Sequence, residues 1–83
     1  MNVNYLIKLW ESSNIDTILI RNLPVARETD KVIVEPITIL TKDEKLYFGE
    51  KLTSYEYIRT IYEHCIFEFI SSKDMLEVKV IYK

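Results

Sequence analysis

Residues 53–71, TSYEYIRTIYEHCIFEFIS, decide how this sequence divides into helices and strands. Thr53 and Glu56 have the spacing of a capping box, in which each side chain bonds the backbone of the other residue and fixes a helix start. Beyond them, apolar residues recur on one side of a helical projection: Tyr55, Ile58, Ile61, Tyr62, Cys65, Ile66 and Phe69. The pattern predicts an amphipathic helix over residues 54–71, with Cys65 buried on its apolar side.

The second half of this segment also fits a strand. Phe67 and Phe69 alternate with Ile66, Glu68 and Ile70, and a short apolar run of this kind does not distinguish helix from strand. Residues 75–82 form a predicted strand in either case, because their apolar and charged residues alternate. On the second interpretation, residues 65–70 form a hairpin with this strand across residues 71–74, and both interpretations stay open.

The two interpretations place Phe67 differently. In a helix it falls opposite the apolar side, near Glu63, where solvent is expected. A large exposed aromatic residue indicates a contact with another chain, so the helical interpretation predicts a partner-binding surface. That surface comprises Phe67 with Glu63, His64 and Glu68 around it. In a strand, the Phe67 ring turns inward instead.

The remaining elements are predicted from periodicity and from residues that break it. Asn2 is placed to cap a helix over residues 3–12, and residues 15–21 are typical of a strand. Residues 31–41 resume strand character around Pro36, which indicates an edge strand or a bulge. Residues 45–52 form a predicted third strand, in which Gly49 marks a bulge.

These elements define one α+β domain spanning residues 1–83. Their predicted order is α-β-β-β-α-β, in two layers, with an antiparallel meander packed against a long amphipathic helix. The polar segment 26–31 connects two strands, and connections of this kind often carry binding residues. Arg27, Glu28 and Asp30 are therefore further candidates for partner contact.

Composition excludes several classes of function. A single glycine excludes the glycine-rich phosphate-binding loops, which need several glycines. A structural zinc site normally needs four cysteine or histidine ligands, and the chain has only Cys65 and His64. We expect no catalytic residues, no cofactor and no small-molecule substrate. The single cysteine allows no internal disulfide, as is typical of a cytoplasmic protein. No apolar run approaches the length of a membrane span, so no membrane association is expected.

The function expected from these features is protein binding. A formal net charge of −2 without a basic stripe makes a nucleic-acid partner less favoured than another protein or a second copy of the chain. The Ile, Lys, Asn and Tyr bias resembles that of short accessory proteins of AT-rich phages, archaeal viruses and other mobile elements. We therefore expect a regulator or inhibitor, of an anti-defence type, that covers a partner's surface.

The alternative is a nucleic-acid-binding accessory protein. In this alternative, Tyr47 or Phe48 stacks on bases beside Lys45 and Lys51.

Overall fold

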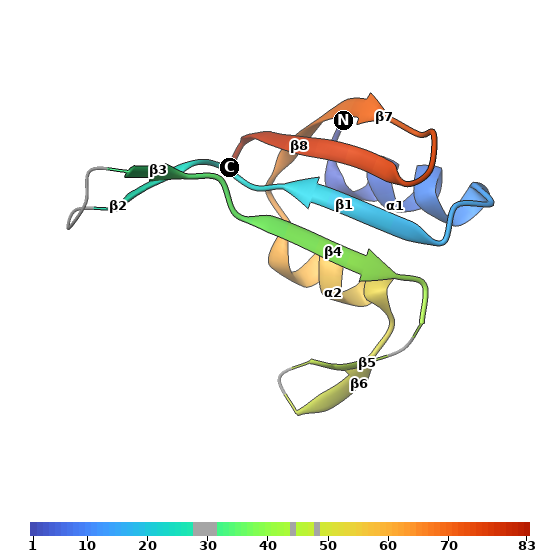
Figure 1. Ribbon diagram of the computed structural model, residues 1–83. Helices are drawn as coiled ribbons and strands as arrows, with labels where there is room; N and C mark the ends of the chain where they lie inside the picture. The colour runs from blue at the N-terminus through green and yellow to red at the C-terminus, as the bar shows by residue number, and fades with distance from the viewer. Residues whose placement is uncertain (28–31, 44, 48) are drawn as a thin grey trace.

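The computed structural model describes residues 1–27, 32–43, 45–47 and 49–83. Within them, helices and strands follow in the order shown in Figure 1. The elements are α1 (Val3–Ser12), β1 (Thr17–Arg21), β2 (Val25–Arg27), β3 (Val32–Val34), β4 (Ile37–Thr41), β5 (Lys45–Tyr47), β6 (Glu50–Leu52), α2 (Ser54–Ile61), β7 (Ile66–Ser71) and β8 (Leu76–Tyr82). None of the described helices is long and apolar enough to cross a bilayer.

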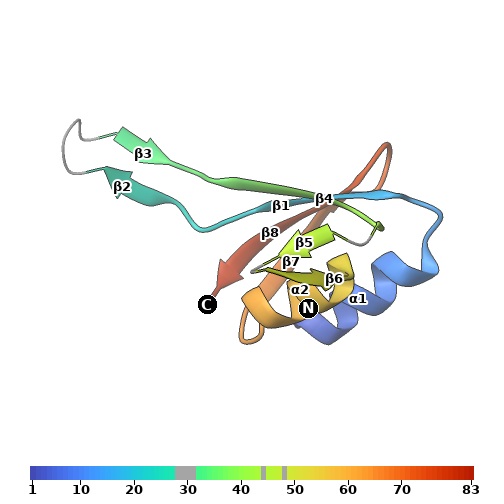
Figure 2. The ribbon, with the colours of Figure 1, turned by 90° about the horizontal axis from the view of Figure 1, so that it is seen from below.

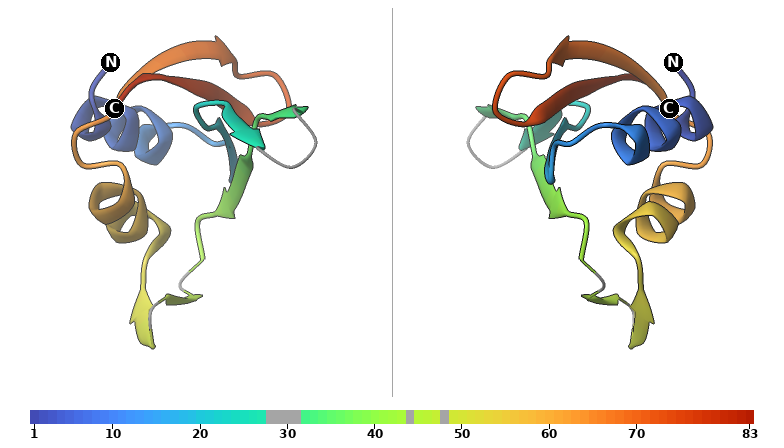
Figure 3. Two further views of the ribbon diagram at one scale, coloured as in Figure 1. Left: turned by 90° about the vertical axis from the view of Figure 1, so that its left-hand side faces the viewer. Right: turned by 90° about the vertical axis from the view of Figure 1, so that its right-hand side faces the viewer.

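Four strands form a mixed sheet in the order β4-β1-β8-β7. β1 pairs antiparallel with β4 and parallel with β8, and β7 and β8 form an antiparallel hairpin. The predicted meander is therefore wrong in detail, since a parallel pair lies at the centre of the sheet. Both helices cover one face of this sheet, as Figure 2 and Figure 3 show, so that the chain is a compact α+β fold.

The core lies between this sheet face and the two helices. Trp10 of α1 meets Tyr55 of α2 edge to face, with ring centroids 5.2 Å apart, and its indole nitrogen donates to the Ile15 carbonyl at 3.0 Å. The buried apolar residues come from both helices, all four strands of the sheet and the turn before β7: Val3, Leu6, Ile7, Trp10, Ile18, Ile20, Leu40, Ile58, Tyr62, Cys65, Phe67, Leu76, Val78 and Val80.

Both predicted helix starts are confirmed. The Asn2 side chain accepts a hydrogen bond from the Tyr5 backbone at 2.9 Å and caps α1, which spans the predicted residues 3–12. Thr53 and Glu56 form the capping box, with the Thr53 hydroxyl oxygen accepting from the Glu56 N–H at 3.1 Å. Local hydrogen bonds of this kind are formed by residues three apart, which explains why the sequence predicts them well.

The helix predicted over 54–71 is wrong beyond Ile61. α2 ends there, and residues 66–71 form β7, as the alternative interpretation predicted. This segment forms a strand and not a helix because pairing with β8 satisfies its backbone hydrogen-bonding groups. A strand also matches its period-two alternation of side chains. The second helix is accordingly short, not long.

Phe67 is the residue that this correction moves most. It pairs with Val80 across the β7–β8 hairpin and is only 1% exposed, with its ring 5.7 Å from that of Tyr62. The expectation that Phe67 faces solvent is therefore wrong. Strand geometry turns the side chain toward the helices, where burial contributes about 1.5 to 3 kcal/mol.

Residues 45–52 also differ from the prediction. They form a separate hairpin of β5 and β6 instead of one strand paired to the sheet, and Figure 3 shows this hairpin projecting away from the sheet. Gly49 has φ +81° and lies in the turn, so it marks a turn and not a bulge. The Ser54 hydroxyl donates to the Thr41 carbonyl, which ties the start of α2 to the end of β4.

The strand predicted over residues 31–41 is divided at Pro36 into β3 and β4, which belong to different sheets, and the predicted edge position is confirmed for β4. β4 belongs to the main sheet, whereas β3 pairs with β2 in a hairpin that extends beyond the sheet (Figure 2). Ile33 on this hairpin is 73% exposed, and Val25 is also exposed. The hairpin thus carries apolar side chains outside the core.

Candidate functional site

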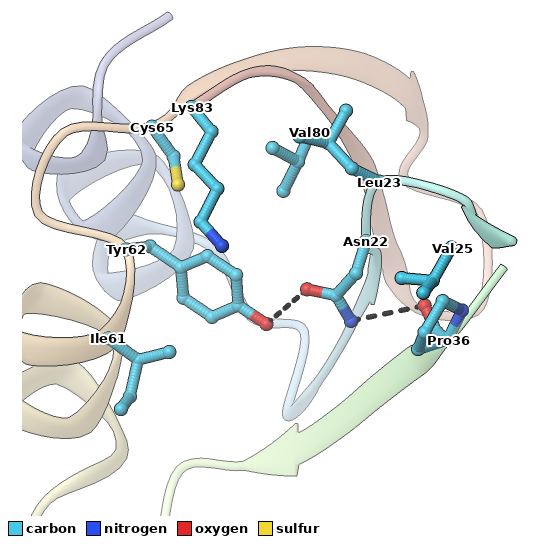
Figure 4. A pocket seen from close by; sticks show the side chains of 9 residues that line it. All are labelled: Asn22, Leu23, Val25, Pro36, Ile61, Tyr62, Cys65, Val80 and Lys83. Carbon is cyan, nitrogen blue, oxygen red and sulfur yellow. Dashed lines mark hydrogen bonds between the residues drawn. The ribbon is translucent and has the colours of Figure 1, made fainter.

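A pocket of about 300 Å³ lies where the β2–β3 hairpin leaves the sheet. Its lining comes from the ends of β1, β8 and α2 and from the two segments that lead into and out of the hairpin (Figure 4): Asn22, Leu23, Val25, Pro36, Ile61, Tyr62, Cys65, Val80 and Lys83. Because β1 and β8 run parallel, their carboxyl ends meet at this end of the sheet.

The floor of the pocket is rigid and apolar. Tyr62, Cys65 and Val80 belong to the buried core, so they are held in place by packing on their other sides. Ile61 and Val25 are exposed and stand at the rim. A pocket of this volume is at the small end of the range for ligand sites.

Three side chains close a hydrogen-bonded cycle beside the pocket, and two of them, Tyr62 and Asn22, line it. The Tyr62 hydroxyl donates to the Asn22 side-chain oxygen at 2.6 Å, and the Asn22 side-chain nitrogen donates to the Thr38 hydroxyl at 3.0 Å. Since the Tyr62 proton is used in this way, the Thr38 hydroxyl donates to the Tyr62 oxygen at 2.9 Å. The cycle joins α2, β1 and β4, and the Asn22 nitrogen also donates to the Pro36 carbonyl at 3.1 Å (Figure 4).

The electrostatics of the pocket favour neutral groups at its floor. Burial raises the pKa of the Cys65 thiol, and the nearby Lys83 charge offsets this only in part. Burial likewise raises the pKa of Tyr62, against the lowering effect of its bonds to Thr38 and Asn22. Both groups therefore stay protonated at neutral pH, and a protonated thiol is a poor nucleophile. Lys83, whose side chain is directed into the pocket in Figure 4, supplies a positive charge.

The residues predicted to bind a partner do not gather at this pocket. Glu63 and His64 lie exposed in the turn between α2 and β7, with 3.8 Å between the His64 Nε2 and a Glu63 carboxylate oxygen. Glu68 is exposed on β7, where it pairs in register with Lys79 and not with His64. Phe67, predicted to be the centre of the surface, lies in the core, and a partner-binding role for the exposed residues stays a prediction.

The other predicted contact residues lie mostly outside the described structure. Glu28 and Asp30 belong to segment 28–31, and the side chain of Arg27 is also not described. The nucleic-acid alternative likewise stays a prediction, because the side chains of Lys45, Tyr47 and Phe48 fall outside the described residues, while Lys51 is exposed. Among the residues described, no three His, Cys, Asp or Glu side chains are close enough together to hold a metal ion.

Sequence reasoning did not find the pocket. Its lining is drawn from four separate stretches of the chain. Ile61, Tyr62 and Cys65 were expected only on the apolar side of a helix, and Pro36 only at an edge strand or a bulge. The available signal was Asn22, a polar residue directly after a buried strand and before Leu23-Pro24. That signal becomes informative only when β8 is known to lie beside β1.

Comparison of the chain with protein-family models, with curated proteins and with solved structures finds no match in any of the three. Its function is therefore argued from the geometry of the site.

Proposed function

We propose that this chain is a small non-catalytic protein-binding module that acts by covering part of a partner protein, as a regulator or inhibitor does. The observation that carries the proposal is the pocket at the base of the β2–β3 hairpin, with exposed apolar side chains beside it. A partner would insert one apolar side chain over Cys65 and Val80 and pack its neighbouring residues against Val25 and the hairpin.

The charge at the pocket indicates what stands next to that apolar side chain. Lys83 is directed into the pocket, and the Tyr62 and Asn22 polar atoms are already engaged with each other. A partner segment with an acidic residue beside its apolar anchor would therefore complement the site, since a charge at the rim of an interface contributes to orientation and specificity. Binding in this mode needs no change in the core, because the pocket floor is already formed.

Position-specific cross-linking tests this proposal. A photoreactive phenylalanine analogue at Val25 is expected to form a covalent adduct of one defined mass in the cells that naturally contain the protein. The matched control places the same analogue at Leu46, which is also exposed but lies on β5, away from the pocket. In a competition control, the cells are lysed first and excess unmodified protein is added to the lysate before irradiation. This competitor should abolish the adduct at position 25.

Two results would count against the proposal. Adducts of the same masses at both positions would indicate non-specific contact with exposed apolar residues. The absence of an adduct at position 25, with the variant folded, would remove the pocket as a protein-binding site.

A further inference from the structure

The two outer strands of the sheet differ in how their free edges are protected. At β7, the Phe67 N–H donates to the Met1 carbonyl and the Met1 amino group donates to the Phe67 carbonyl, both at 2.7 Å. A register shift between Phe69 and Ser71 further disrupts this edge. Covering segments and bulges are the usual protections against strand addition. The edge of β7 is therefore closed at its start and irregular further along.

The hydrogen bonds of β4 show which of its residues face outward. The Asn22 N–H donates to the Pro36 carbonyl at 2.8 Å, so the residues that bond to β1 are Pro36 and every second residue after it. The backbone groups of Ile37, Ile39 and Thr41 consequently point away from β1. The Thr41 carbonyl confirms this independently, because it accepts from Ser54, which lies outside the sheet.

The unprotected part of this edge is short and apolar. The Thr41 carbonyl is occupied and Pro36 precedes the strand, so two residues remain, Ile37 and Ile39. Within the described residues, their outward N–H and C=O groups have no hydrogen-bond partner. Their side chains are 50% and 59% exposed. An edge with unpaired backbone groups and uncharged side chains of this kind is a template for pairing with another strand.

We propose that the partner at this edge is a second copy of the chain, with β4 pairing antiparallel to β4 of that copy about a two-fold axis at Thr38. In this register Ile37 of each copy lies opposite Ile39 of the other. The two Ile37–Ile39 pairs formed in this way are hydrogen-bonded pairs, and the residues of each pair exchange two N–H to C=O bonds. All outward groups of both residues in both copies are then satisfied.

Neighbouring registers satisfy fewer of these groups. An axis at Ile39 sets Ile37 opposite Thr41, whose carbonyl is already bonded to Ser54. An axis at Ile37 sets Ile39 opposite Glu35, beyond the end of β4. The edge is therefore complementary to itself in one register, which is the requirement for a two-fold interface.

Side chains and position also favour this pairing. Residues 36–41 carry no charge, so the two copies bring no like charges together along the paired segment. The four isoleucines gather on the sheet face that the helices leave open, and cross-strand pairs of β-branched residues stabilise antiparallel strands. The axis lies near the start of β4, whereas the chain turns toward β5 at the other end (Figure 1).

Sedimentation of matched variants tests the pairing. The wild type should form a dimer, and Ile39→Lys should raise the dimer dissociation constant at least tenfold. Leu46→Lys, the same change at an exposed leucine of β5, should leave it unchanged. A wild type that remains monomeric at millimolar concentration, or two variants that dimerise alike, would overturn the proposal.

Amide hydrogen exchange of the wild type covers the case in which Ile39→Lys fails to fold. Exchange at Ile37 and Ile39 should slow as the protein concentration rises, whereas exchange at Thr38 and Leu40, which bond to β1, should be slow throughout. If the sedimenting dimer leaves exchange at Ile37 and Ile39 fast, the dimer forms elsewhere and the proposal is wrong.

Disulfide trapping tests the register. In a Cys65→Ala background, chains with Ile37→Cys mixed with chains carrying Ile39→Cys should cross-link, because hydrogen-bonded pairs have Cα atoms about 5.5 Å apart. Either variant alone should cross-link far less. Equal cross-linking by one variant alone, or none in the mixture, would exclude this register. Pairing at the edge and partner binding at the pocket use different residues, so either can fail without the other.

Discussion

Phe67 and Phe69 lie two residues apart on β7 but contribute very differently to the core. Phe67 is 1% exposed, whereas Phe69 is 48% exposed near the irregular end of the strand. We expect Phe67→Ala to lower the free energy of unfolding by about 3 to 5 kcal/mol, the usual range for a buried phenylalanine. Phe69→Ala is the matched control and should cost less than half as much in denaturant titrations. Equal costs would contradict the inward orientation of Phe67.

Cys65 links burial to pH dependence. Burial raises the pKa of its thiol, so the native state keeps a proton that the unfolded state loses first as the pH rises. The free energy of unfolding should therefore decrease between about pH 8.5, the ordinary thiol pKa, and the higher native pKa.

Comparison with Cys65→Ala isolates this effect. Denaturant titrations of both proteins from neutral to alkaline pH should show the wild type losing stability relative to the variant. Parallel pH profiles would mean that the thiol ionises as easily in the folded state as in the unfolded state.

At the scale of elements, the capping box of α2 makes a defined contribution. Thr53 accepts from the Glu56 backbone, and Thr53→Ala should lower the free energy of unfolding by about 1 kcal/mol. Thr60→Ala on the same helix is the control, because the Thr60 hydroxyl bonds only to a carbonyl within the helix. If both variants unfold at the same denaturant concentration as the wild type, the capping box does not stabilise α2.

The start of α2 is predictable from the sequence and its end is not. The cap depends on residues three apart, but residues 65–70 suit both helix and strand. Pairing with β8, which follows later in the chain, stabilises the strand over the helix in this segment. Residues 45–52 show the same limit, since Gly49 fits a bulge or a turn and only the pairing of Tyr47 with Glu50 places it in a turn.

The candidate site was still less predictable, for a reason that concerns the whole molecule. The parallel pairing of β1 with β8 joins Ile18 to Leu76, and no local pattern specifies which distant strand lies beside β1. The pocket exists because this pairing brings the ends of both strands to the end of α2. The contact residues predicted around Phe67 were instead selected by their exposure on a helix that ends earlier, and those of segment 26–31 by their place in a polar connection.

The two apolar surfaces for which we propose partners differ in geometry. The edge of β4 offers backbone groups to a flat strand, and the pocket offers a concave site to a single side chain. Both border Pro36, which stands between β3 and β4. The edge is suited to self-association, and the pocket to a different partner.

If the pocket binds a segment of another protein, as we propose, the isolated chain should bind short peptides at this site. A peptide selected from a random library on the purified protein should bind with an apolar residue beside an acidic one. Val25→Asp, at the rim, should weaken binding at least tenfold, whereas Leu46→Asp should leave it within twofold. Selected peptides that bind both variants as tightly as the wild type would contradict the account.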